Sequence, residues 1–261
     1  MEHIIQHFRK EEQPFIEKVL GWKIEVENQY APKLTPFLDP REQYIVQSII
    51  GHNDSIQTLS EGAFEEAERK RMMIYPSYFE PSFDDFEISV LELSYPSKFI
   101  HLQHRDILGA LLSLGIDRNQ FGDIRIDGER GQFVCTKEMQ IFIQANLTQV
   151  GKAKIRLSEV TNLEQLMSPT EIWKEKILTV SSMRLDVVLA NSLDIARQKS
   201  QQLIQGGKVK VNLAIREETS MELEEGDIIS CRGFGRLKVL SIEGRTKKDK
   251  IRLQIGQLEQ K

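Results

Sequence analysis

Basic and amide side chains are concentrated in residues 183–212, which read MRLDVVLANSLDIARQKSQQLIQGGKVKVN. Arg and Lys neutralise phosphates, and the Gln amide can hydrogen-bond phosphate, ribose or base. The stretch from Arg197 to Gln205 contains no acidic residue, whereas a merely solvated helix surface usually carries charges of both signs. We therefore predict that this segment contacts RNA. The candidate RNA-binding residues are Arg184, Arg197, Gln198, Lys199, Gln201, Lys208, Lys210 and Arg236.

Two short helices and a strand are expected to position these side chains. Arg184 opens the first helix, and Asp194 is expected to cap the second. The second helix ends at Gly206-Gly207, because glycine readily adopts a left-handed backbone. In the strand 208–212, alternation turns the two valines inward and the two lysines and the asparagine outward. The apolar helix positions are Leu185, Val188, Leu189, Leu193, Ala196, Leu203 and Ile204.

The charge of the chain is unevenly distributed along the sequence. Its formal net charge is −4. Residues 182–252 contain 14 Lys and Arg against 10 Asp and Glu, a net charge of +4, whereas residues 1–181 contain 20 against 28, a net charge of −8. An acidic body with a basic end indicates that one part of the chain meets a polyanion.

Composition sets the broad class of the protein. With 261 residues, 40% of them hydrophobic and 28% charged, a folded chain of two or three domains is expected. No apolar run is long enough to span a membrane, and the charged N-terminus does not resemble a signal peptide. Cys135 and Cys231 are far apart, which fits a reducing compartment. We expect a cytoplasmic protein, with a monomer favoured.

Residues 1–76 are expected to form a mainly helical N-terminal domain. Apolar residues recur at helical spacing within 4–20. The sequence Asp39-Pro40-Arg41-Glu42 predicts a helix start, because Asp can cap, Pro suits the first turn, and Glu lies three residues after the cap. A further short helix is expected from Ser60 to Arg71, and the turn-rich residues 75–81 indicate a boundary.

Residues 77–165 have the pattern of a ferredoxin-like, or RRM-like, domain. The expected order βαββαβ comprises 86–93, 106–114, 123–127, 132–136, 137–147 and 153–157. Base stacking on this sheet would need exposed aromatic residues on its central strands, and Phe133 fits the core better. Residues 166–181 are expected to be a linker and a strand, and 245–261 a C-terminal strand or tail. The predicted fold class is α+β.

The basic segment resembles the S4 RNA-binding domain, over residues 182–244. The match consists of an ordered set of short motifs: Arg184-Leu185-Asp186, Arg197 with Lys199, LIQGGKVKVN at 203–212, and GDII at 226–229. Ala196 stands where the pattern often has Ser, and Leu213 stands where it often has Gly. The resemblance implies a small α+β domain at the C-terminus that binds RNA.

The whole chain resembles the YlmH family of bacterial proteins. Three blocks carry the resemblance: FLDPREQYI at 37–45, HRDILGALLSLGIDRNQFGDI at 104–124 and GDIISCRGFGRLKV at 226–239. The resemblance implies an N-terminal domain, an RRM-like middle domain and the S4 domain. It also implies ribosomal or transfer RNA as partner, with the large ribosomal subunit as the expected place of binding, and links to ribosome-associated quality control and to cell-division gene neighbourhoods.

Two other functions remain open from the sequence, an accessory RNA-modification factor and a cell-division-linked interaction protein. A pseudouridine synthase needs a large catalytic domain, normally after the S4 domain, and few residues follow 240. A methyltransferase needs a Gly-rich loop after a strand, whereas Gly206-Gly207 follows a helix. The Arg184-Leu185-Asp186 triplet is similar to the catalytic triplet of such a synthase, but the helical spacing of the apolar residues around it explains it better. We therefore expect a non-catalytic protein.

Histidines near acidic residues are potential metal ligands. His101 and His104 lie near Asp106, and His3 and His7 are four residues apart. Neither group has the Cys or carboxylate partners that a closed zinc site needs. We expect surface or capping roles for them, and no metal or cofactor.

Overall fold

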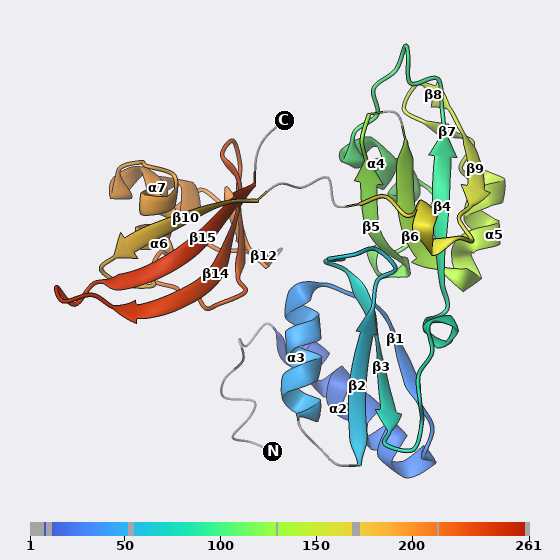
Figure 1. Ribbon diagram of the computed structural model, residues 1–261, viewed down its shortest axis with the longest axis horizontal. Coiled ribbons are helices and arrows are strands. Elements are labelled where there is room, and N and C mark those ends of the chain that lie inside the picture. The colour runs from blue at the N-terminus through green and yellow to red at the C-terminus, as the bar shows by residue number, and fades with distance from the viewer. Residues whose placement is uncertain are drawn as a thin grey trace. The chain divides into compact units, whose positions relative to one another are not determined.

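The computed structural model describes residues 8, 12–51, 55–128, 130–168, 173–212 and 214–258 (Figure 1). His3, His7 and Leu213 lie outside these ranges. The chain forms two compact units, Met1–Thr170 and Glu171–Lys261, and the predicted mixed α+β class is confirmed. Within the described ranges, no helix has the length and apolar character needed to cross a membrane.

The first unit begins with two helices packed on a small antiparallel sheet (Figure 1). The sheet has the strand order β1-β3-β2, and the expected helical domain therefore also contains strands. Ile16 and Val19 of the first helix and Ile45 and Val46 of the second are buried against Ile74 of the central strand. The elements are α2 (Gln13–Gln29), β1 (Lys33–Leu38), α3 (Pro40–Ile50), β2 (Ile56–Glu61) and β3 (Lys70–Pro76).

The start of α3 is the capped helix that the sequence predicts. The Asp39 side chain accepts a hydrogen bond from the backbone N–H of Glu42 at 2.9 Å. The Glu42 carboxylate accepts one in return from the backbone N–H of Asp39 at 2.8 Å, and Pro40 occupies the first turn. This local prediction is confirmed because all of its partners lie within four residues of sequence.

The helix expected from Ser60 to Arg71 is wrong. Residues 62–69 form a compact turn between β2 and β3, with Ala63 and Glu66 at positive φ (64° and 54°). The turn buries Phe64 and Ala67 against Val134 of the middle domain. Long-range burial of these two side chains has therefore overridden the local helical pattern.

The predicted βαββαβ order of the middle domain is confirmed. The sheet order β5-β6-β4-β9 is that of a ferredoxin-like fold, with both helices packed on one face. The last strand begins at Arg156, because residues 149–154 form the separate hairpin β7 (Gln149–Val150) and β8 (Ala153–Lys154). The other elements are β4 (Ile88–Ser94), α4 (His104–Ser113), β5 (Phe121–Ile126), β6 (Gly131–Thr136), α5 (Lys137–Asn146) and β9 (Arg156–Glu159).

The face of this sheet that α4 and α5 leave uncovered packs against the N-terminal domain. Phe37 of β1 and Phe64 are buried together with Val90 and Val134 from the two central strands. Gly122 in β5 permits the close approach, because a Cβ built there would lie 2.9 Å from the Phe37 ring. The Asp123 carboxylate accepts hydrogen bonds from the backbone N–H groups of Glu68 (2.7 Å) and Arg69 (3.0 Å), which ties the N-terminal domain to β5.

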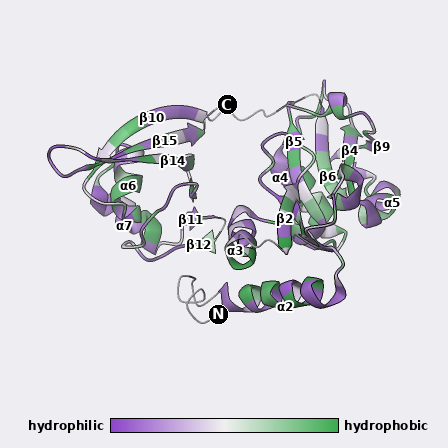
Figure 2. Cartoon of the chain, turned by 60° about the horizontal axis from the view of Figure 1, so that its bottom comes forward, coloured by the Kyte–Doolittle hydropathy of each residue, from purple (hydrophilic) through white to green (hydrophobic). Residues whose placement is uncertain are grey.

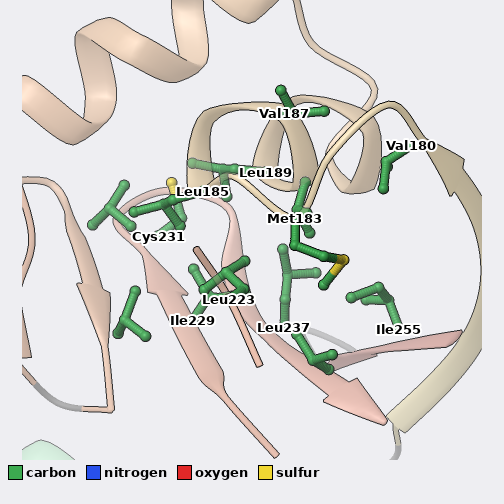
Figure 3. Packing of buried hydrophobic residues seen from close by; sticks show 14 of the residues in the cluster. Val180, Met183, Leu185, Val187, Leu189, Leu223, Ile229, Cys231, Leu237 and Ile255 are labelled. Carbon is green, nitrogen blue, oxygen red and sulfur yellow. The ribbon is translucent and has the colours of Figure 1, made fainter. Parts of the chain in front are cut away.

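The second unit is a six-stranded antiparallel sheet with two short helices on one face. The strand order is β10-β15-β14-β13-β11-β12, and β10 pairs with β15 from Trp173 to Val180. Figure 3 shows Leu185 and Leu189 of the first of these helices lying over Ile229 and Leu237 of the sheet. The elements are β10 (Trp173–Val180), α6 (Leu185–Ser192), α7 (Arg197–Gln205), β11 (Val209–Val211), β12 (Ala214–Ile215), β13 (Ile228–Cys231), β14 (Gly235–Arg245) and β15 (Ile251–Leu258).

We predict that Gly122→Ala destabilises the first unit by about 1–3 kcal/mol, because the added methyl group overpacks the contact with Phe37. The control is Gly109→Ala in α4, where nothing lies within 4 Å of the added Cβ. That change should raise stability by about 0.5–1 kcal/mol, because alanine is the better helix former. Scanning calorimetry measures both. Equal melting temperatures for the two variants would contradict the close packing of the two domains.

Candidate nucleic-acid interface

Two of the three arginines in the predicted interface lie at the starts of the two helices in the second unit. Arg184 immediately precedes α6, as expected, and Arg197 is the first residue of α7. The expected cap at Asp194 is wrong, because α7 begins after Ala196. Asp194 instead has a left-handed backbone (φ 53°) where the chain reverses, and its side chain pairs with Lys176 at 2.8 Å. Ala196, expected on the apolar side, is exposed.

The carboxylate of Asp186 joins both arginines and Gln201 in one hydrogen-bonded group. Asp186 lies in the first turn of α6, and 0% of its surface is exposed. Arg184 donates to it from Nε at 3.1 Å and from Nη2 at 3.4 Å, to different carboxylate oxygens. Arg197 donates from Nε at 2.9 Å and Gln201 from Nε2 at 2.8 Å, both to Oδ2. Asp186 therefore anchors the predicted cationic surface.

The hydrogen bonds around Asp186 keep its carboxylate ionised despite its burial. Loss of solvation by itself raises the pKa of Asp186, because it disfavours the charged form. The hydrogen bonds from Arg184, Gln201 and Arg197 favour the charged form and outweigh this effect, so the pKa of Asp186 falls to about 2. The negative charge is thus permanent at neutral pH, and it fixes the positions of two permanent positive charges.

Both arginines remain accessible to a ligand while they are held. The exposed fraction of the side chain is 35% for Arg184 and 54% for Arg197. Each guanidinium has five N–H donors, and only part of each set points to Asp186. The remaining donors form an ordered cationic pair of the kind that binds phosphate oxygens.

The surface of α7 continues this cationic pair. Gln198 and Lys199 are exposed, and Leu203 and Ile204 are buried in the core, as the sequence predicts. Arg197 and Gln201, four residues apart, lie on the same side of the helix, and both contact Asp186. We define the helix surface as the five candidate residues at the start of α6 and on α7, of which Asp186 joins the first, second and last: Arg184, Arg197, Gln198, Lys199 and Gln201.

The remaining candidates do not belong to the helix surface. Lys208 is exposed between α7 and β11. Lys210 is exposed on the face of the sheet opposite the helices, since its neighbours Val209 and Val211 are in the core. Ser230 of β13 lies opposite Lys210 on one side and opposite Arg236 of β14 on the other, so Arg236 is on the same face as Lys210. The Arg236 guanidinium lies 5.8 Å from the centre of the Trp173 ring.

Asn212 differs from the expectation that it points outward. Its backbone has a positive φ of 49°, and its side chain donates to the Asp227 carboxylate at 2.6 Å. Its side-chain oxygen also accepts from the backbone N–H of Ile228 at 2.9 Å. The Asn212 and Gly226-Asp227 motifs of the S4 pattern are therefore one structural unit that joins β11 to β13.

The central strands of the middle sheet carry no exposed aromatic residue in the part of the chain that the structure describes. On the described central strands β4 and β6, the only aromatic residue is Phe133, which is fully buried on the helix side, as the sequence predicts. On the opposite face, the Gln132 side chain donates to the carbonyl of Gln165 at 2.9 Å and accepts from the backbone N–H of Met167 at 2.9 Å. This face is therefore covered by residues 163–168 and by the N-terminal domain.

The potential metal ligands Asp106 and His104 lie at the start of a helix, and both cysteines are buried. Asp106 accepts from the backbone N–H of Gln103 at 2.8 Å and so caps α4, which begins at His104. No group of three or more His, Cys, Asp or Glu in the described ranges could hold a metal ion. Cys135 and Cys231 are buried and form no disulfide, and burial raises the pKa of the Cys135 thiol to about 12.

Three protein-family profiles match consecutive parts of the chain. Residues 11–79 match the profile described as "YlmH, N-terminal". Residues 81–164 match "Putative RNA-binding domain in YlmH". Residues 183–229 match the "S4 domain", which contains the helix surface and Lys208 and Lys210.

Two relatives are similar to this chain over long stretches. The "Ribosome-associated protein quality control protein P2" of Bacillus subtilis (strain 168) is 44% identical over 253 residues, which are 97% of this chain and 98% of the relative. The solved structure of "Cell division protein ylmH from Streptococcus pneumoniae" is 38% identical, with a TM-score of 0.54, and the match covers 62% of this chain and 98% of that one.

We predict that Asp186→Asn destabilises the second unit by about 1–3 kcal/mol at pH 7, because the substitution removes the anchoring charge. The pKa of Asp186 is about 2 in the folded state, below the value of about 3.9 expected when unfolded. Its stabilisation is therefore complete above pH ~4 and is lost as the pH falls toward ~2. Thermal unfolding at pH 7, 4 and 3 should show the difference between wild type and variant shrinking with acid. A constant difference would contradict the assigned role.

Proposed function

The chain belongs to the YlmH family, and on that premise we propose that it is a non-catalytic cytoplasmic protein that binds ribosomal or transfer RNA on the large ribosomal subunit. The observation that carries the proposal is the arginine pair that buried Asp186 holds beside the acid-free surface of α7. The name of the Bacillus subtilis relative, at 44% identity, supports a role in ribosome-associated quality control.

The helix surface suits a sugar-phosphate backbone. Flexible cationic side chains lose conformational entropy when they bind, whereas Arg184 and Arg197 are already ordered by Asp186 before any ligand arrives. Exposed Gln198 adds a neutral donor and acceptor, which suits ribose hydroxyls and base edges. Duplex RNA presents a wide, shallow minor groove with 2′-hydroxyls and phosphates, and a short helix surface can lie against it.

The setting of Asp186 also supports a non-catalytic role. A catalytic carboxylate must reach its substrate, whereas Asp186 is fully buried and its oxygens accept hydrogen bonds from three side chains. The Arg184-Leu185-Asp186 triplet is therefore explained by the architecture of the helix surface.

The experiment that tests the proposal is Arg197→Ala, with binding to purified bacterial ribosomes measured at several salt concentrations. The loss of one contact to a phosphate should make the negative slope of log K against log salt shallower by about 0.7–0.9. The fold should survive, because the Arg197 side chain is itself exposed and the buried Asp186 carboxylate keeps Arg184 and Gln201 as hydrogen-bond partners. A thermal melt of the variant checks this.

The matched control is Arg156→Ala, which removes an exposed arginine from β9 in the first unit. It should leave both affinity and salt dependence unchanged. If Arg197→Ala and Arg156→Ala give the same salt dependence as wild type, Arg197 makes no phosphate contact and the proposed RNA-binding surface is refuted there.

A further inference from the structure

The basic end of the chain has its charge excess in a segment beyond the S4 match. Residues 182–244 contain nine Lys and Arg and nine Asp and Glu, so their net charge is zero. The net charge of +4 for residues 182–252 therefore comes entirely from residues 245–252, which read RTKKDKIR. The S4 profile ends at residue 229, so this segment lies outside it.

These residues form the tip of the hairpin between β14 and β15. The last pair of the ladder is Arg245 with Ile251, and residues 246–250 extend beyond it. Figure 1 shows the hairpin in red extending past the ends of the strands, and Figure 2 shows its loop as hydrophilic. We define residues 245–252 as the basic hairpin.

The turn of the basic hairpin has a defined geometry. The backbone N–H of Thr246 donates to the carbonyl of Lys250 at 2.7 Å, and that of Asp249 donates to the carbonyl of Thr246 at 2.9 Å. Asp249 has a left-handed backbone (φ 57°), and its carboxylate pairs with Arg245 at 2.8 Å. The turn is therefore closed by its own hydrogen bonds.

The two arginines of the basic hairpin form ion pairs with the acidic residues in and next to it. Asp249 pairs with Arg245, and Glu243 pairs with Arg252 at 2.7 Å. Lys247, Lys248 and Lys250 are all exposed, and none of them forms an ion pair within the described part of the chain. Three cations without acidic partners thus point into solvent from one turn.

The basic hairpin lies at the same end of the sheet as the helix surface. Ile251 at the base of the tip pairs with Val180, the last residue of β10. The chain runs from Val180 to Arg184 in four steps, which span at most about 14 Å. One extended polyanion can therefore reach both the arginine pair and the hairpin lysines.

We propose that the basic hairpin is a second RNA-backbone contact, which binds phosphates through Lys247, Lys248 and Lys250 without regard to sequence. This inference rests on the proposed RNA-binding function and extends its surface beyond the S4 motif. RNA is favoured over a lipid surface because the tip, Thr246 to Lys250, contains no apolar or aromatic side chain to enter a bilayer. The helix surface within the same unit already suits RNA.

The test uses the full chain with the triple substitution Lys247→Ala, Lys248→Ala and Lys250→Ala. Binding to purified bacterial ribosomes is measured by co-sedimentation at several KCl concentrations between about 0.05 and 0.3 M. The negative slope of log K against log salt should become shallower by about two units. Affinity near 0.1 M salt should fall by about 10- to 100-fold. Replacing the same three lysines with arginine should retain both values.

The matched control removes three exposed lysines from the first unit, Lys98, Lys152 and Lys154, and so changes net charge equally. It should leave the slope unchanged. An unchanged slope for the hairpin variant, while Arg197→Ala still flattens it, would overturn the hairpin contact and leave the proposed function standing. Unchanged slopes for both would overturn both. Loss of binding to vesicles containing phosphatidylglycerol, with ribosome binding intact, would overturn RNA as the occupant.

Discussion

A buried carboxylate determines how the second unit presents charge. An ionised group removed from water is costly unless charged and hydrogen-bonding partners surround it. Asp186 meets that requirement with two arginines and an amide, and the same contacts fix Arg184 and Arg197 at the surface. One set of hydrogen bonds therefore both stabilises the buried charge of Asp186 and orders the two arginines of the helix surface. The apolar residues of α6 and the sheet below hold that set in place.

The first unit uses an RNA-recognition-like fold in a different way. The sheet face that would stack bases is covered by Phe37, Phe64 and residues 163–168, and Gly122 lets the two domains approach closely. In this chain the sheet therefore serves as a packing platform that joins the N-terminal and middle domains. The contacts that we propose for an RNA backbone lie in the second unit, on the helix surface and the basic hairpin.

Local patterns in the sequence predict most of the fold. The capped start of α3 and the strand and helix order of the middle domain depend on neighbouring residues and on periodicity, and both are confirmed. The helix expected at 60–71 is wrong because Phe64 and Ala67 are buried against a domain far along the chain. The role of Asp186 does not follow from spacing, because burial of a charged residue depends on partners brought together by α7. The net charge of +4 is a sum over residues 182–252, and such a sum does not show that the excess lies in residues 245–252.

We propose that RNA contacts the second unit and not the middle sheet. Crosslinking of the wild-type protein to RNA in purified ribosome complexes, followed by mass spectrometry of the crosslinked peptides, distinguishes the two. We expect crosslinks within residues 184–210 and 245–252, and none on the face of β4 and β6 opposite α4 and α5. Crosslinks concentrated on β4 and β6, with the second unit unlabelled, would contradict this proposal.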